Sequence, residues 1–370
     1  MTVLLETPLW EFLRERDSPV TATPTQHQNP LMQVPEVPGD LTAEAVIQTA
    51  GSIAELQLPS GMIQWFPGGH ADPWNHVEAA MALATAGYVD HAERAYEWLV
   101  DKQLPNGAWH NYYLADGIED SKLDSNCVAY IATGIWHQYL VTGDVETLRR
   151  FWPTVDRAIE FVLDLQTRRG EIIWAMRADG TRWSYALLTG SSSISHSLHC
   201  ATEIATTLGH ERPRWNEGRT RLVEVIANNP DAFEPKDRWA MDWYYPVLTG
   251  AITGDDAKKR MESGRETFIM AEKGVRCVSD RPWVTAAESC ECAIAFLAAG
   301  NREAALEIFR WVQPLRDAEG AYFTGIVFPE FVHFPDNERS SYTAAAVILA
   351  ADAFYGQNPS SSLFTNYYPV

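Results

Sequence analysis

Carboxylates and aromatic side chains recur together in several polar stretches of this sequence. Trp and Tyr rings stack on the apolar faces of sugars, while carboxylates bind hydroxyls or act as acid and base. The candidate catalytic carboxylates are Asp72, Asp124, Glu171, Asp179 and Glu330. The residues expected to bind substrate beside them are Trp65, His70, Trp74, Trp109, Tyr112, Trp174, Trp183, Asp242, Trp243, Trp283 and Glu338. This mixture predicts a carbohydrate cleft, although it also suits the cation–π environment of an isoprenoid cyclase.

Other roles compete for some of these residues. Asp72 precedes Pro73, which is typical of an N-cap before a first-turn proline, and Asp124 and Ser192 are further candidate caps. The histidines and cysteines lack the spacing of metal ligands, so we expect neither a metal nor a cofactor. The run Ser191–Ser193 has no nucleophile-elbow pattern, which disfavours covalent serine catalysis.

Glycoside hydrolysis needs two carboxyl groups on opposite sides of the scissile bond, roughly 6.5–9.5 Å apart when the configuration inverts. In a ring of six helical hairpins, the loops after the fifth and eleventh helices face each other. The second of these loops carries Glu330 and Glu338, and the first carries Glu171 and Asp179. We therefore expect Glu330 to be the base that activates water and Asp179 or Glu171 to be the acid, with Asp72 and Asp124 holding hydroxyls.

The elements that must position these residues are helices. Apolar residues recur at 3.6-residue spacing and strict alternation is missing, so the pattern predicts helices only. The expected helices are 41–56, 73–87, 89–103, 124–142, 144–166, 192–208, 213–228, 239–251, 256–272, 283–299, 301–313 and 340–355. Twelve helices with alternating short and long links predict six hairpins, an all-α (α/α)6 toroid. Residues 1–40, interrupted by Pro19, Pro24, Pro30, Pro35 and Pro38, are expected to form an irregular arm on a single barrel domain, 41–370.

A short repeat supports this architecture. A glutamine, a glycine and an aromatic residue follow the ends of odd-numbered helices, as in Gln103, Gly107 and Trp109. The other copies are Gln57–Gly61–Trp65, Gln166–Gly170–Trp174 and Gln313–Gly320–Tyr322. We interpret them as structural punctuation, with the glycine at the helix end and the aromatic ring folded back over it. The even helices then line the barrel, and their N-termini meet at one end.

The composition of the sequence limits the classes of molecule that the protein is expected to bind. The formal net charge of -20 argues against nucleic acid and anionic membrane surfaces, but not against neutral sugars. No apolar run reaches the roughly 18–20 residues of a membrane span, and no secretory signal is visible. Five cysteines without framework spacing favour a reduced compartment. We expect a soluble cytoplasmic protein, possibly a monomer, that acts on a small molecule or an oligosaccharide.

The segment from Asp124 to Gly209 resembles bacterial glucoamylase-like and trehalase-like six-hairpin glycosidases. The matching features are Asp124-Ser125, Gly143-Asp144, Arg150-Phe151-Trp152-Pro153, the turn Gly170 to Trp174, and Ser192 to Cys200, with Phe334-Pro335 further on. The resemblance implies hydrolysis by a carboxylate pair and gives Glu330 the place of the base. One position departs from the family pattern, because the acid that follows the turn tryptophan is replaced by Ala175.

The copy from Trp98 to Trp109 also resembles the repeat of squalene-cyclase and protein-prenyltransferase barrels. Their Asp-x-Asp-Asp motif and zinc ligands are missing, so this likeness implies the toroid and not the chemistry. Transformation of a glycoside is the first functional hypothesis. An isoprenoid or terpenoid enzyme is the second, and a non-catalytic sugar-binding barrel, favoured by Ala175, is the third.

Overall fold

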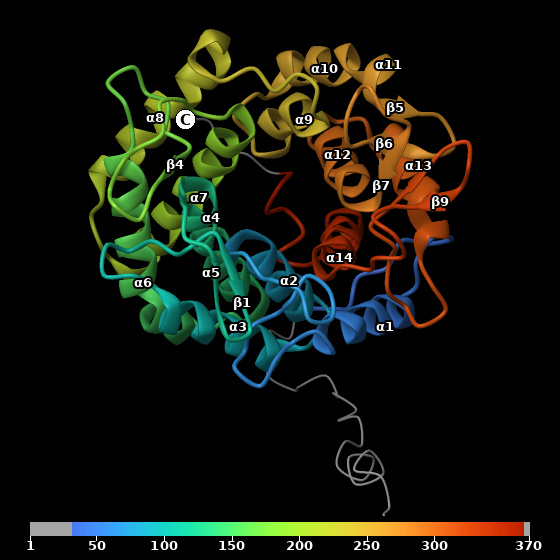
Figure 1. Ribbon diagram of the computed structural model, residues 1–370, viewed down its shortest axis with the longest axis horizontal. Coiled ribbons are helices and arrows are strands. Elements are labelled where there is room, and N and C mark those ends of the chain that lie inside the picture. Colours follow the sequence, from blue (N-terminus) through green and yellow to red (C-terminus); the bar gives the residue numbers. More distant parts are fainter. Residues whose placement is uncertain (1–31, 366–370) are drawn as a thin grey trace, which may run out of the picture.

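Two concentric rings of helices form the protein (Figure 1). The computed structural model describes residues 32–365. The inner ring consists of α2 (Pro73–Thr85), α4 (Ser125–Ala129) continued by α5 (Ile131–Thr142), α7 (Leu188–Leu208), α9 (Ala240–Leu248), α12 (Ala286–Ala298) and α14 (Ser341–Tyr355). The outer ring consists of α1 (Ala43–Ala54), α3 (Val89–Lys102), α6 (Val145–Asp164), α8 (Pro213–Asn228), α10 (Gly254–Ser263) with α11 (Arg265–Phe268), and α13 (Arg302–Val312).

The inner ring closes because α14 packs against both α12 and α2. The predicted (α/α)6 toroid is thus confirmed, and its helices lie within a few residues of the predicted ranges. Two short 3-10 helices, Pro230–Ala232 and Gln313–Leu315, complete the helical elements. Most of the predicted arm, residues 1–40, lies outside the described residues. Among residues 32–365, no helix combines the length and the apolar character needed to cross a membrane.

Burial distinguishes the two rings. The outer helix α6 buries one stripe, which includes Leu148, Phe151 and Val155 at helical spacing. The inner helix α14 is buried at every residue from Thr343 to Phe354. An inner helix is packed on all sides, so its sequence shows little amphipathic pattern. The core therefore lies between the rings and inside the inner one.

Short strands occupy the end of the barrel where the inner helices begin, here called the mouth. They are β1 (Tyr112–Leu114), β2 (Gly117–Asp120), β3 (Leu123–Asp124), β4 (Ala175–Met176), β5 (Ile269–Met270), β6 (Gly274–Arg276), β7 (Trp283–Thr285), β8 (Gly325–Val327) and β9 (Val332–His333). Strands β1 and β2 form a hairpin, β3 pairs with β4, and β5 to β9 form an antiparallel sheet in chain order. The sequence did not predict these strands, because segments of two to four residues carry no measurable alternation.

Backbone pairing links each mouth loop to the next around the whole ring. The six links, here called the collar, join Ala71 to Tyr113, Asp124 to Ala175, Ala186 to Glu234, Ala240 to Cys277, Ala286 to Thr324, and Ser341 to Trp65. The last link, from Ser341 N to Trp65 O at 2.8 Å, connects the start of α14, the last inner helix, to the loop before α2, the first inner helix. The loops of the mouth are therefore fixed against one another as well as against the helices.

The repeated glutamine fixes the outer ring in a similar way. The Gln103 side-chain amide donates to the carbonyl oxygens of Gly107 and Thr154, both at 2.9 Å. Thr154 belongs to the next outer helix, so the amide joins two successive hairpins. Gln57 repeats the arrangement with Gly61 and His91, and Gln166 repeats it with Gly170 and Gly218. The fourth copy differs, because Gln313 donates to Phe309 O within its own helix. We call the first three arrangements glutamine staples.

The glycine of a staple is required by the close approach of the next outer helix. Gly107 has φ +91°, and a Cβ atom there would lie 2.3 Å from the carbonyl oxygen of Arg157. We expect Gly107→Ala to lower the free energy of unfolding by about 2–4 kcal/mol, through left-handed strain and a backbone clash.

Gly180 is a matched control, because it has φ +88° and no atom within 4 Å of the added Cβ. Gly180→Ala should cost only the strain, about 1 kcal/mol. Urea denaturation of both variants tests the expectation. An equal loss of stability in the two variants would show that the helix contact does not require the glycine.

Candidate functional site

Asp72 caps α2 at the mouth, as its position before Pro73 predicted. Its Oδ1 accepts hydrogen bonds from the backbone N–H groups of Trp74 and Asn75, at 2.9 and 3.1 Å. Its Oδ2 accepts from Trp65 Nε1 at 2.7 Å and from the Asn75 side chain at 2.9 Å. Burial raises the pKa of Asp72, while these four donors oppose the rise. Both carboxylate oxygens thus have fixed positions.

Asp124 caps α4 in the same manner. Its Oδ1 accepts from the backbone N–H of Asn126 at 3.0 Å and of Cys127 at 3.4 Å. Burial raises the pKa of Asp124, and the nearby Lys122 acts in the opposite direction. The prediction that Ser192 caps a helix was wrong: the residue lies inside α7, and its hydroxyl donates to Leu188 O.

Glu288 lies in the first turn of α12 and is half-buried. The Cys277 thiol is hydrogen-bonded to its carboxylate. Tyr342, in the first turn of α14, is close enough that Glu288 adds to the burial that raises the pKa of its hydroxyl. The Tyr342 ring packs edge-on against Trp65, with centroids 4.8 Å apart. Since Trp65 donates to Asp72, a chain of contacts through Tyr342 and Trp65 connects Glu288 with Asp72.

Below the mouth, a buried polar layer crosses the barrel axis. Glu78 of α2 accepts from Trp74 Nε1 at 2.9 Å and from the Tyr130 hydroxyl at 3.1 Å. The Trp74 ring also packs edge-on against Tyr245 of α9, with centroids 5.8 Å apart. Burial raises the pKa of Glu78 to about 7, against the effect of these hydrogen bonds.

A second glutamate completes this layer. Glu291 of α12 accepts hydrogen bonds from the hydroxyls of Tyr244 and Tyr245. Burial, and then the charge of Glu78, raises the pKa of Glu291 well above its usual range. Both glutamates line a cavity of about 20 Å³, which has room for one water molecule. Two carboxyls this close in a buried layer disfavour double ionisation, so the layer holds at least one proton near neutral pH.

Most of the expected substrate-binding residues lie half-buried around the mouth. They are Trp65, His70, Trp74, Tyr112, Trp174, Trp183, Asp242, Trp283 and Glu338. His70 stacks on Tyr112 at 4.4 Å and forms an ion pair with Glu119 at 2.7 Å. Asp242 accepts from the Thr189 hydroxyl at 2.6 Å, and Trp174 stacks on Tyr185 at 5.5 Å. The sequence therefore identified much of the lining of the mouth.

Two tryptophans from the expected set belong to the core instead. Trp109 is 1 % exposed, and its Nε1 donates to Leu99 O at 2.7 Å. Trp243 stacks on Phe268 at 5.5 Å and donates to Arg260 O. Neither ring has a free face for a sugar. Trp109 instead folds back over the end of α3, the structural role that its repeat predicted.

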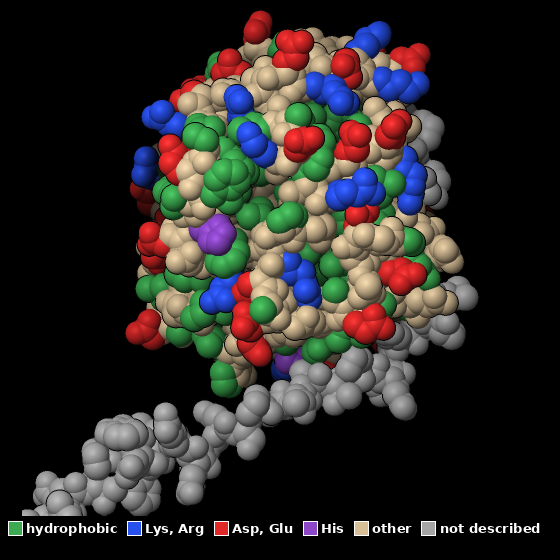
Figure 2. Space-filling view, turned by 90° about the vertical axis from the view of Figure 1, so that its right-hand side faces the viewer, with side chains coloured by type: hydrophobic (Ala, Val, Ile, Leu, Met, Phe, Trp, Pro, Cys, Tyr) green, Lys and Arg blue, Asp and Glu red, His purple; other side chains and the backbone are tan. Residues whose placement is uncertain are grey.

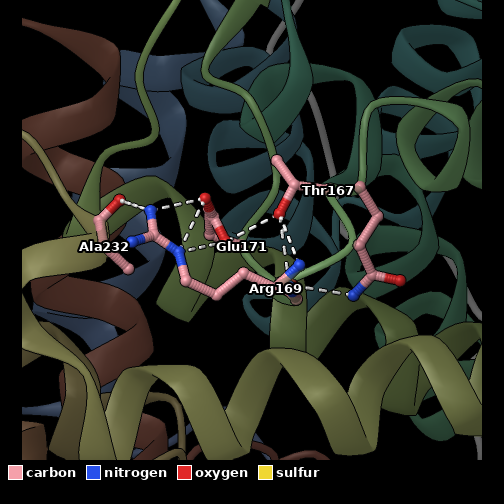
Figure 3. Close-up of polar contacts among 6 residues, drawn as sticks. Thr167, Arg169, Glu171 and Ala232 are labelled. Carbon is pink, nitrogen blue, oxygen red and sulfur yellow. Dashed lines mark hydrogen bonds and ion pairs between the residues drawn. The ribbon is translucent and has the colours of Figure 1, made fainter.

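The three carboxylates expected to perform acid–base chemistry lie apart from this set. Glu171 forms an ion pair with Arg169 at 2.7 Å and accepts from the Thr167 hydroxyl, as Figure 3 shows. Arg169 also reaches Ala232 O, so this group ties the loop after α6 to the segment after α8. Asp179 is exposed in a turn, where it accepts from Thr181 N, and Glu330 is exposed in the β8–β9 loop.

Sequence reasoning missed Glu78 and Glu291, and it did not include Glu288 among the candidate site residues. A signal was present for the first two. Each is a charged residue inside an Ala-rich helix whose neighbouring positions are all buried, as in the sequences of α2 and α12. A carboxylate at such a position has no solvent face, which marks it as a partnered group inside the barrel.

Comparison with known proteins supplies the family context. The chain is 46% identical over 331 residues to the MMP endo-(1,4)-3-O-methyl-alpha-D-mannosidase of Mycolicibacterium hassiacum, covering 90% of this chain and 92% of that protein. No protein-family model matches the chain.

Solved structures share the fold at low sequence identity. A wild-type glycosidase superposes with a TM-score of 0.68 at 13% identity, covering 85% of this chain and 97% of that one. A D-mannose isomerase gives a TM-score of 0.65 at 13% identity, covering 84% and 96%. Cellobiose 2-epimerase from Spirochaeta thermophila gives 0.62 at 13% identity, covering 85% and 96%. These matches confirm the six-hairpin toroid, while the prenyltransferase-like label has no support among them.

The raised pKa of Glu78 predicts a pH-dependent stability difference. Between pH 4.5, which is the usual pKa of the group, and about pH 7, Glu78 keeps its proton in the native state and loses it in the unfolded state. The free energy of unfolding therefore falls as the pH rises through this range. Glu78→Gln should therefore match the wild type near pH 4.5 and exceed its free energy of unfolding by roughly 1–3 kcal/mol above pH 7. Urea denaturation from pH 4.5 to 8 measures this difference. Glu330→Gln, at an exposed carboxylate, should give a flat difference, and a flat difference for Glu78→Gln would contradict the expectation.

Proposed function

Because this chain belongs to the family of the MMP endo-(1,4)-3-O-methyl-alpha-D-mannosidase, we propose that it hydrolyses internal 1,4 linkages in a mannoside chain carrying 3-O-methyl groups. At the level of class, the chain is a carbohydrate-active enzyme, a glycoside hydrolase, as its sequence predicted. The observation that carries the finer proposal is the identity of 46% along 90% of the chain, together with carboxylates at the starts of the inner helices.

Hydrolysis requires a proton donor for the leaving oxygen and a second carboxylate that remains charged. We assign these roles to Glu288 and Asp72. Both belong to helix starts at the mouth, and contacts through the rings of Trp65 and Tyr342 connect them. Such rings supply the apolar surface on which a sugar can stack between two carboxyl groups.

Hydrogen bonding distinguishes the two roles. Asp72 accepts hydrogen bonds from four donors, and donors to a carboxyl group favour its ionised form. Asp72 therefore suits the partner that remains charged. Among the described residues, the partner beside the Glu288 carboxyl group is the Cys277 thiol, a weak donor, so its oxygens remain accessible to the leaving oxygen of a substrate.

Asp124 is proposed to bind substrate hydroxyls. Its Oδ1 is occupied by the cap of α4, and Lys122 favours its charged form. A carboxylate at the mouth is a strong acceptor for sugar hydroxyls when it is ionised. Asp242 and Glu338, which already accept hydroxyl hydrogen bonds from Thr189 and Thr324, are suited to the same task.

Substitution of the assigned pair tests the proposal. Glu288→Gln and Asp72→Asn should each lower kcat by about 10²–10⁴-fold on a 3-O-methylated 1,4-α-mannoside oligosaccharide, with released fragments measured by mass spectrometry. Asp124→Asn should mainly raise KM. Glu330→Gln is the control for the first variant, since it makes the same change at an exposed carboxylate and should leave activity unchanged.

A substrate with a good leaving group separates the two roles. A dinitrophenyl glycoside of the same oligosaccharide needs no proton donor, so it should restore activity to Glu288→Gln and not to Asp72→Asn. Rescue of Asp72→Asn alone would reverse the two roles. Full activity in both variants would exclude this pair from catalysis.

A further inference from the structure

An exposed apolar strip lies along the mouth beside α12. Phe331, Val332 and Phe334 of the β8–β9 region are 68%, 58% and 50% exposed. The half-buried Trp283 and the buried Phe328 support these exposed residues, since Phe328 packs edge-on against Phe331 and Trp283 against Phe334, each with centroids 5.1 Å apart. We call these five residues the apolar lip. Figure 2 shows the flank that carries β9, with hydrophobic side chains gathered beside a histidine.

The apolar lip is held in place by the sheet and, through the buried ring of Phe328, by the hydrophobic core. Trp283 begins β7, which pairs with β8, and its Nε1 donates to Phe334 O at 3.3 Å. Phe331 has φ +59°, a conformation that is unfavourable for a bulky side chain. Backbone strain of this kind concentrates at ligand-binding positions. The loop thus exposes its aromatic rings, and one of them, Phe331, has an unfavourable backbone conformation.

The apolar lip is continuous with the proposed catalytic residue. Strand β7 ends at Thr285, the N-cap of α12, and Glu288 lies in the first turn of that helix. A sugar chain cleaved internally must extend beyond Glu288 in both directions. The units on the side of β7 would then pass over Trp283 and Phe334.

We propose that the apolar lip binds the O-methyl groups of the substrate chain and sets the preference for methylated over unmethylated mannosides. This inference rests on the proposed function. A methyl ether replaces a hydroxyl donor by an apolar group, which gains from contact with aromatic rings and loses hydrogen bonds at a polar surface. Unmethylated sugars have no comparable gain at this surface. At three- to fourfold in affinity for each buried methyl group, two contacted groups give about a tenfold preference.

A double substitution on the exposed rings tests the proposal. Phe331→Ser with Phe334→Ser removes two exposed side chains, and the Trp283 bond to the backbone of residue 334 can persist. Val100→Thr is the control, because this exposed residue lies on the outer helix α3. Affinity for 3-O-methylated and unmethylated 1,4-α-mannosides of equal length is measured by calorimetry in the Glu288→Gln background, and KM in the wild-type background.

We expect the tenfold preference for the methylated chain in the wild type and in Val100→Thr, and its loss in the double variant. The kcat on the unmethylated chain should not change. Equal affinity of the wild type for both chains, or an unchanged preference in the double variant, would overturn the role of the apolar lip while leaving hydrolysis intact. Absence of cleavage of either chain would instead contradict the proposed function, whereas the binding comparison would still decide the role of the lip.

Discussion

The collar of backbone hydrogen bonds is the constraint on which the mouth depends. Loops between helices are normally the most variable and mobile parts of a fold. Here each of the six mouth loops pairs with its neighbours, and the contact from Ser341 to Trp65 closes the circle. A backbone bond at each link fixes the loop that leads into each inner helix. Side chains at the starts of these helices, including Asp72, Asp124 and Glu288, are thereby held in place.

The glutamine staples fix the outer ring of helices as the collar fixes the mouth. Together, the staples and the collar explain how the barrel tolerates two buried carboxyl groups at its centre. The Glu78–Glu291 layer costs stability, because burial disfavours ionised carboxyls. Four aromatic partners, Trp74, Tyr130, Tyr244 and Tyr245, satisfy these groups by hydrogen bonds. Such a layer persists only where the surrounding helices are fixed, since a partly satisfied polar network is worse than an apolar one.

The sequence predicted the frame better than the site. Helix periodicity and the alternating loop lengths were sufficient for the toroid, and the residue before Pro73 was sufficient for the cap at Asp72. The contacts of the candidate site residues form only in the folded chain, and the sequence pattern did not predict them. Glu171 is the clearest case: a polar loop residue of the right type is committed to Arg169, two positions away. The sequence analysis selected Glu330 as a catalytic candidate and not Glu288. In the structure, the sheet places Cys277 beside Glu288, whereas Glu330 is exposed.

Ala175 shows how a barrel of this kind can keep its architecture while the proton donor is placed at a different position. In the glucoamylase-like pattern this position carries the acid; here it pairs in register with Asp124 across β3 and β4. Side chains directly opposite on antiparallel strands lie about 5 Å apart, so a glutamate at position 175 would face Asp124 at the distance where carboxyls repel. Alanine removes that conflict and leaves Lys122 as the nearby charge, which opposes the rise that burial causes in the pKa of Asp124. The proton donor must then come from another wall of the mouth, which is where α12 presents Glu288.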